Sequence, residues 1–164
     1  MKYCPECKSA LVLRTLDGVE RKACADRDCS FVGWDNPVPV VAGLILHEDK
    51  LLLAHNRLWP EGVFSMITGY LERHEAPQAA IIREAREELG VETLSAEFIG
   101  HYPFIAKNQI IMAFVLTTTG HVNLGNEIDA VESLDLQQVR KKDFGALVLT
   151  QQIVNDWLKR CKPA

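Results

Sequence analysis

The pattern of apolar and polar positions divides the chain near residue 35. Residues 1–34 are dense in cysteine and charge with little apolar periodicity, whereas apolar runs separated by polar turns follow from residue 38 onward. Between them, the stretch WDNPVP contains two prolines, and a proline disfavours helical backbone in the residue before it. We therefore expect a small N-terminal unit over 1–34, an extended linker, and a larger domain over 38–160.

Four apolar runs predict strands of the larger domain, at 40–48, 50–56, 96–104 and 109–118. The first two are so close in sequence that they are expected to pair through a tight connection. Helices are expected over 77–89 and about 147–160. For the first helix, Pro77 suits the opening turn and Gly90 suits the C-terminal cap. Mixed strands and helices predict an α/β or α+β core covered by helices.

Four of the five cysteines form two close pairs, Cys4 with Cys7 and Cys24 with Cys29. A polar stretch with an Asp-Gly turn joins the pairs, so a hairpin is expected to bring them together. Thiolates are soft ligands, and four of them make the usual tetrahedral site for structural Zn²⁺. The alternatives are four independent thiols or a redox C-x-x-C, which normally opens a helix in a larger unit. Cys161 stands alone and is expected to be a spare thiol.

The first predicted helix carries three carboxylates on one face, because Glu84, Glu87 and Glu88 stand at i, i+3 and i+4. The opposite face, expected to be buried, carries Ile82, Ala85 and Leu89. One interpretation is a solvated helix in which Arg83 and Glu87 form an ordinary ion pair. Glu84 and Glu88 do not fit this interpretation, since like charges four residues apart reduce helix stability by a few tenths of a kcal/mol. Clustered carboxylates instead suit a hard divalent cation shared with a substrate phosphate.

The spacing around this helix matches a longer pattern. From Gly69 the chain reads glycine, five residues, Glu75, seven residues, and then REAREELGV from Arg83 onward. This stretch resembles the Nudix box, G-x5-E-x7-R-E-U-x-E-E-x-G-U, in which U is a bulky aliphatic residue; Ala85 is small for its U position. The resemblance covers about residues 38–157. It implies an α/β/α sandwich around a mixed sheet, with the box forming a loop, a helix and a loop.

The Nudix family hydrolyses nucleoside diphosphates linked to another moiety, so the resemblance implies a pyrophosphohydrolase that depends on Mg²⁺ or Mn²⁺. The implied metal ligands are the carboxylates of Glu84, Glu87 and Glu88 and the carbonyl oxygen of Gly69. Glu75 and Arg83 are implied as residues that orient the helix and its carboxylates. The cations would neutralise the pyrophosphate, position a water and stabilise the leaving phosphate.

The resemblance leaves the general base open between a box glutamate and a glutamate outside the box. Glu127 lies where several relatives carry a loop glutamate that reaches the metals, and the alternative is an ordinary loop charge. A departure from the family is His74, which replaces the glycine of the usual E-x-G-E. If the backbone there has a positive φ, histidine adopts it at some energetic cost.

A cysteine ribbon directly before a Nudix domain resembles the NADH pyrophosphatase group, which also removes NAD caps from RNA. Similar ribbons precede some plastid FAD and ADP-ribose pyrophosphatases. The NADH pyrophosphatase group carries S-Q-P-W-P-F-P-x-S after the box. Here Tyr102, Pro103 and Phe104 resemble the W-P-F of that motif, while its Ser-Gln, its last Pro and its Ser are missing. Tyr70 lies where relatives carry an aromatic that stacks on a base, with a core tyrosine as the alternative. The expected substrate-binding residues are Tyr70, Tyr102 and Phe104.

A net charge of −4 and a pI of about 5.7 do not favour an electrostatic nucleic-acid binder. A small basic patch in the N-terminal unit stays open, made of Arg14, Arg21, Lys22 and Arg27. More often such a ribbon only caps a fold or an interface. The longest apolar run, 38–46, is too short to span a bilayer, and the N-terminus shows no apolar signal region. We therefore expect a cytoplasmic protein without membrane contact, and a homodimer stays open.

Two classes of function compete, an enzyme and a non-catalytic nucleotide- or RNA-binding module with a zinc ribbon. The intact carboxylates of the box favour the enzyme. The expected substrate is a nucleotide-containing diphosphate, such as NADH or NAD-capped RNA, with FAD and ADP-ribose as alternatives. The expected ions are catalytic Mg²⁺ or Mn²⁺ and structural Zn²⁺.

Overall fold

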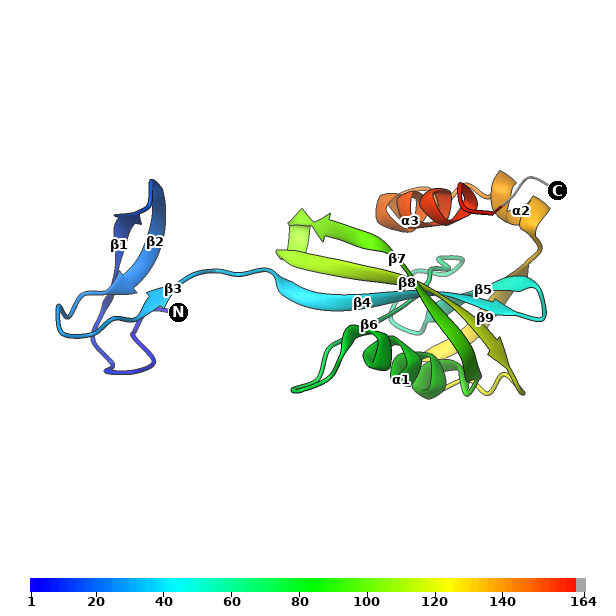
Figure 1. The fold of residues 1–164 in the computed structure, drawn as a ribbon, viewed down its shortest axis with the longest axis horizontal. Helices are drawn as coiled ribbons and strands as arrows, with labels where there is room; N and C mark the ends of the chain where they lie inside the picture. Colours follow the sequence, from blue (N-terminus) through cyan, green and yellow to red (C-terminus); the bar gives the residue numbers. More distant parts are fainter. Residues whose placement is uncertain (162–164) are drawn as a thin grey trace. The chain divides into compact units, whose positions relative to one another are not determined.

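In the computed structural model, which describes residues 1–161, the chain divides into two units between Pro37 and Val38 (Figure 1). The break lies within the stretch that contains two prolines. The extended linker is shorter than predicted, because Pro39 already belongs to the first long strand of the second unit. Proline is tolerated near the start of a strand, where few ladder hydrogen bonds are lost.

The first unit is a three-stranded antiparallel sheet in the order β1 (Leu11–Leu16), β2 (Val19–Cys24) and β3 (Val32–Gly33). The predicted turn between β1 and β2 is confirmed, since Asp17 and Gly18 both have positive φ, 50° and 79°. Two successive positive φ values are what a tight hairpin with right-handed strand twist requires. The fully buried apolar residues of this unit are few, namely Cys4, Ala23 and Cys24.

The second unit is built on a mixed six-stranded sheet. Its strands are β4 (Val38–His47), β5 (Lys50–Asn56), β6 (Ile67–Tyr70), β7 (Glu92–Phe104), β8 (Gln109–Thr119) and β9 (Ile128–Leu134). The order is β7-β8-β4-β5-β9, and β6 pairs with β4. The β4–β8 pair is parallel and the other pairs are antiparallel. The four predicted strands are therefore confirmed, whereas β6 and β9 were not predicted.

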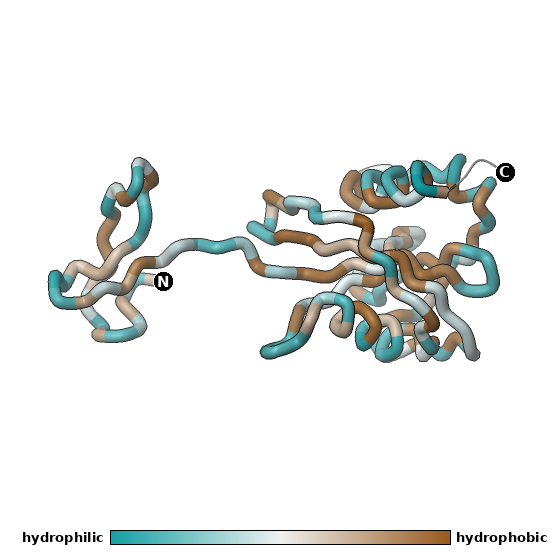
Figure 2. Tube along the Cα trace, viewed as in Figure 1, coloured by the Kyte–Doolittle hydropathy of each residue, from teal (hydrophilic) through white to brown (hydrophobic). Residues whose placement is uncertain are grey.

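Helices cover both faces of this sheet, α1 (Pro77–Leu89) on one and α3 (Val148–Leu158) on the other (Figure 1). A short α2 (Leu136–Lys141) and a 3-10 turn, η1 (Ile105–Lys107), complete the unit. Alternation along β4 explains the layers: Val40, Ala42 and Leu44 pack in the core that includes α3, while Val41 and Ile45 pack against α1. The brown, apolar stretches of the chain run along these strands (Figure 2). The predicted α/β/α sandwich around a mixed sheet is confirmed.

Helix α1 has the predicted bounds and the predicted caps. Pro77 occupies its first turn, and Gly90 has φ 69° and donates its backbone N–H to the carbonyl of Arg86. Its buried residues differ in one place from the prediction. Ile81 is fully buried, whereas Ile82 is only partly buried, because positions 81, 85 and 89 form one stripe four residues apart. Helix α3 ends two residues before its predicted end at 160.

Within residues 1–161, no helix is long and apolar enough to cross a bilayer.

Candidate functional site

A cavity of about 1090 Å³ in the second unit brings together most of the residues singled out from the sequence. Its lining contains the glutamates Glu84, Glu87, Glu88 and Glu127, and beside them Gly69, Tyr70, Arg83 and Phe104. These residues come from strand β6, helix α1, the end of β7 and the segment before β9. With Glu72, five carboxylates line this cavity against two cationic side chains, Arg83 and Lys107, so its charge suits cations more than anions.

Arg83 organises the acidic side of the cavity. It binds Glu75 through two parallel hydrogen bonds, Nε to Oε1 at 2.9 Å and Nη2 to Oε2 at 3.0 Å. Its Nη1 donates to Glu84 at 2.8 Å and to Glu87 at 3.1 Å. These hydrogen bonds lower the pKa of Glu75 and raise that of Arg83. Arg83 therefore holds three carboxylates in place, and its Nη2 also donates to the carbonyl of Tyr70 at 3.1 Å.

Gly69 is needed because Glu84 lies directly against the backbone of β6. A Cβ at position 69 would lie 2.1 Å from the carboxyl carbon of Glu84, far inside van der Waals contact. Burial raises the pKa of Glu84, and the hydrogen bond from Arg83 acts in the opposite direction. The sequence suggested Gly69 through its carbonyl, and the structure adds a steric role for its missing side chain.

Glu88 is the most deeply buried carboxylate of the cavity. Burial first, and then the negative charges of Glu84, Glu127 and Glu87, together raise its pKa to about 8. No ion pair among residues 1–161 involves Glu88. A buried carboxylate without a cationic partner is costly, so this wall of the cavity fits a cation.

The glutamates of the cavity do not converge on a single point. Within residues 1–161, the four cysteines of the first unit are the only group of three or more such residues close enough to hold one ion. Mg²⁺, however, is commonly bound through one or two carboxylates, with waters and substrate phosphates completing its octahedron. The donor set of Glu84, Glu87, Glu88 and Glu127 therefore fits Mg²⁺ or Mn²⁺ in the presence of a phosphate-containing ligand.

The loop before β9 is anchored to the C-terminal end of α1. The backbone N–H of Gly125 donates to the carbonyl of Glu88, and that of Asn123 donates to the carbonyl of Leu89, both at 2.8 Å. A Cβ at Gly125 would lie 2.3 Å from the carbonyl oxygen of Glu87, so only glycine allows this approach. Gly125 was not predicted from the sequence, although a glycine two residues before a candidate glutamate can indicate a close backbone approach.

This anchoring brings Glu127 to the cavity beside the box glutamates, as the functional interpretation requires. Its backbone carbonyl accepts from Arg57 at 2.9 Å, and its Oε2 accepts from the side-chain amide of Asn56 at 3.5 Å. Both contacts come from the end of β5. Glu127 is therefore held from two elements that are distant in sequence, α1 and β5.

The aromatic candidates separate into two groups. Tyr70 is 59% exposed, lines the cavity and accepts a hydrogen bond from Gln109 at 3.0 Å through its hydroxyl oxygen. Phe104 also lines the cavity. Tyr102 does not: it is 5% exposed, packs in the core on the α3 side, and donates its hydroxyl to Asp156 of α3 at 3.0 Å. Burial raises its pKa to about 12. The structure therefore does not place Tyr102 where it contacts a ligand in the cavity.

Trp59 is an aromatic residue of the cavity that the sequence analysis did not identify. His55 fixes the loop that carries it, with Nε2 3.1 Å from the carbonyl oxygen of Pro60 and Nδ1 2.6 Å from Oδ1 of Asp129. A carbonyl only accepts, so Nε2 carries a proton, and the carboxylate favours a second proton on Nδ1. These two contacts raise the pKa of His55, and the contact with Asp129 has the larger effect. No local pattern in the sequence marked this loop.

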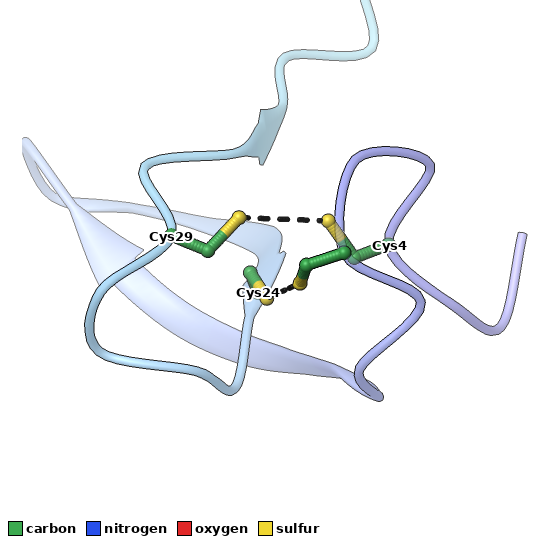
Figure 3. Close-up of side chains that lie close together, drawn as sticks. Cys4, Cys24 and Cys29 are labelled. Atoms are coloured by element: carbon green, nitrogen blue, oxygen red, sulfur yellow. Dashed lines mark hydrogen bonds between the residues drawn. The ribbon is translucent and has the colours of Figure 1, made fainter.

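The four paired cysteines converge in the first unit. Their sulfur atoms all lie within 4.8 Å of one another, with Cys4 3.7 Å from Cys29 and Cys7 3.4 Å from Cys24. Figure 3 shows the side chains of Cys4, Cys24 and Cys29 turned toward one point. Tetrahedral zinc with Zn–S bonds of about 2.3 Å places sulfurs about 3.8 Å apart. The geometry thus fits one metal ion, and the segment after Cys4 is a turn rather than the helix of a redox motif.

Comparison with known families now adds to this geometry. The NUDIX domain family matches residues 37–152. This chain belongs to the Nudix family. The match contains β4, the whole box and Glu127, so the cavity described above is the box region of a Nudix domain.

Similar proteins include enzymes named for a specific reaction. The NAD-capped RNA hydrolase NudC of Vibrio atlanticus is 25% identical over 120 residues, 73% of this chain and 43% of that protein. The human NAD-capped RNA hydrolase NUDT12 is 28% identical over 149 residues, 84% of this chain and 32% of that protein. The chain therefore spans less than half the length of these relatives. A solved Nudix hydrolase of Nitrosomonas europaea has the same fold, with a TM-score of 0.79 at 22% identity, covering 98% of this chain and 92% of that one.

One departure from the Nudix pattern has a visible structural consequence. His74 occupies the position expected to be glycine, and its φ is 68°, within the left-handed region. A histidine in this region costs roughly 1–2 kcal/mol relative to right-handed backbone. The loop of the box is therefore retained here with a strained residue.

Proposed function

We propose that this protein hydrolyses the pyrophosphate bond of a nucleoside diphosphate linked to another moiety, with Mg²⁺ or Mn²⁺ as the catalytic ion. The observation that carries the proposal is one cavity lined by Glu84, Glu87, Glu88 and Glu127. One of these, Glu88, is partly buried and has no ion-pair partner among the described residues. Such a group of carboxylates is costly until a divalent cation neutralises it.

In this proposal the cation is held by Glu84, Glu87, Glu88, Glu127 and the carbonyl oxygen of Gly69. When bound, it neutralises the diphosphate and lowers the pKa of a water. Arg83 and Glu75 act as positioning residues, because their paired hydrogen bonds hold the carboxylates of α1 against the cavity. The proton of the attacking water passes to a carboxylate oxygen of a box glutamate or of Glu127.

The preferred substrate in this proposal is a dinucleotide such as NADH, or an RNA capped with NAD. A cavity of about 1090 Å³ is slightly larger than ordinary ligand sites, which span about 300–1000 Å³, and this size suits two linked nucleotides. Tyr70, Trp59 and Phe104 offer flat surfaces for a base. The relatives from Vibrio atlanticus and human are named NAD-capped RNA hydrolases, which supports NAD-capped RNA as a substrate. FAD and ADP-ribose present the same diphosphate and are the alternatives.

The four cysteines are proposed to hold one structural Zn²⁺, for which their separations are suited. A unit with so few buried apolar residues needs such a bond to stay folded.

The test is a substrate panel with Mg²⁺ and with Mn²⁺, using NADH, NAD-capped RNA, FAD, ADP-ribose and a nucleoside triphosphate at equal concentration. Chromatography should find mononucleotide products from the dinucleotides and slower cleavage of the triphosphate, which has no second group to fill the cavity. Faster cleavage of the triphosphate would refute the substrate assignment alone. Binding of these compounds without cleavage of any would instead support the non-catalytic nucleotide-binding module.

A further inference from the structure

The small sheet of the first unit places two arginines directly opposite each other. In the antiparallel pairing of β1 with β2, Arg14 is the partner of Arg21, so both side chains extend from the same face. Val12 and Val19 lie on that face and are 39% and 51% exposed. Like charges at directly opposed positions destabilise a sheet. We call this surface, made of Val12, Arg14, Val19, Arg21 and Trp34, the arginine face.

Neither guanidinium is neutralised by a carboxylate. Among the ion pairs of residues 1–161, none involves Arg14 or Arg21. Their hydrogen bonds go to backbone carbonyls: Arg14 Nη2 donates to Ala25 at 3.4 Å and Arg21 Nη1 donates to Trp34 at 2.8 Å. In addition, Nε of Arg21 is buried without a hydrogen-bond partner. Donor capacity on this face therefore exceeds what the unit itself satisfies.

Most carboxylates of the unit lie outside its strands. Glu20 is the only one within its strands, and its pairing with Thr15 places it on the opposite face from Arg14. The others are in turns and loops, namely Glu6, Asp17, Asp26, Asp28 and Asp35. The unit has equal numbers of acidic and basic residues, so the positive charge of the arginine face is local.

An aromatic side chain adjoins Arg21. Trp34 is 50% exposed, and the guanidinium carbon of Arg21 lies 4.8 Å from its ring centroid. The stacked arginine fixes the ring in orientation and leaves part of its surface open to solvent. A half-exposed indole beside two unneutralised guanidinium groups offers a flat apolar surface together with donors for phosphate.

We propose that the arginine face binds a single-stranded nucleic acid, with a phosphate between Arg14 and Arg21 and an unpaired base stacked on Trp34. A phosphate between the guanidinium groups offsets the positive charge that their opposed positions bring together. The stacked base requires an unpaired strand, because in a duplex both faces of each base are already covered. The proposal adds a binding surface outside the cavity and stands whether or not the cavity cleaves pyrophosphates.

The experiment measures fluorescence anisotropy of a labelled single-stranded 10-nucleotide RNA with the full chain, from low to moderate salt. Arg14→Gln should weaken binding about tenfold, as expected for the loss of one charge-assisted phosphate contact. It should also reduce the slope of log affinity against log salt by about 0.7. Trp34→Leu should weaken binding by about the same factor with an unchanged salt slope, since stacking releases no counterions.

The matched control is Lys22→Gln, which removes one positive charge from the other face of β2, where Lys22 pairs with Leu13. It should leave affinity within about twofold, and zinc content should confirm that each variant keeps its folded first unit. Equal weakening by Lys22→Gln and Arg14→Gln would overturn the proposal, because attraction would then be diffuse. The proposal would also be overturned if Arg14→Gln and Trp34→Leu both bound RNA with the affinity of the wild type. Loss of a dimer in Trp34→Leu, without RNA binding by the wild type, would assign this face to a second copy of the chain.

Discussion

Replacing Gly69 with alanine tests whether the position of the Glu84 carboxylate controls the reaction. The added Cβ would lie 2.1 Å from the carboxyl carbon, so the carboxyl group must retreat by more than about 1 Å to reach ordinary contact. A displacement of this size at a catalytic group lowers the rate by about a hundredfold. The overpacking itself should cost about 1–3 kcal/mol of unfolding free energy.

The assay compares kcat/KM on NADH, Mn²⁺ affinity by titration calorimetry, and the melting temperature. We expect Gly69→Ala to lose about a hundredfold in kcat/KM, to bind Mn²⁺ more weakly and to melt several degrees lower. Gly100→Ala is the matched control, because it adds the same methyl group to strand β7 at a position that does not line the cavity. The nearest atoms to the added methyl group belong to the ring of Tyr102, 3.2 Å away. A Gly69→Ala enzyme with wild-type turnover would refute the view that Glu84 must lie against β6.

Three further predictions concern other parts of the chain. Glu87→Gln should reduce turnover at least a hundredfold with little change in melting temperature, because relief of carboxylate repulsion offsets the loss of the ion pair with Arg83 at 3.1 Å. Activity like that of the wild type would show that the cation is held elsewhere. Cys24→Ser should release zinc, measured by elemental analysis, and unfold the first unit while far-UV spectra still show α1; stable folding of metal-free protein would contradict this. Asp129→Asn should lower stability most between about pH 4 and 6.5 in urea unfolding. Above about pH 4 Asp129 is ionised, and its lowered pKa means that ionisation stabilises the fold. Below about pH 6.5 His55 is protonated, and its raised pKa means that this proton also stabilises the fold, until pH rises through the folded pKa of His55. A stability difference between wild type and variant that does not depend on pH would contradict this prediction.

The proposed nucleic-acid surface leads to different expectations for long and short substrates. An RNA carrying a nucleotide cap contains both a diphosphate, suited to the cavity, and a strand of unpaired bases, suited to the arginine face. Arg14→Gln should therefore affect capped RNA and leave NADH hydrolysis unchanged, because a dinucleotide has no such strand. This comparison separates failure of the binding surface from failure of the catalytic proposal.

The sequence alone determined the elements whose signals are local. Pro77 and Gly90 defined the ends of α1, because a residue without an N–H suits the first turn and one tolerant of positive φ suits the cap. The Asp-Gly pair set the hairpin of the first unit for the same backbone reason. The i, i+3, i+4 spacing placed three glutamates on one face of a helix before any tertiary contact was known. These predictions depend on backbone geometry over a few residues, which neighbours in space rarely override.

Tertiary structure decided what depends on contacts between distant segments. Tyr102 and Phe104 stand two residues apart on β7, yet α3 covers Tyr102 through Asp156 while Phe104 reaches the cavity. Glu127 joins the other carboxylates only because Gly125 lets its loop bond to the end of α1. Arg14 and Arg21 stand opposite each other because of the register between β1 and β2. That register can be predicted from the sequence only once the position of the turn is known. Each outcome depends on which surfaces are buried together, and that is a property of the packed chain rather than of any short segment.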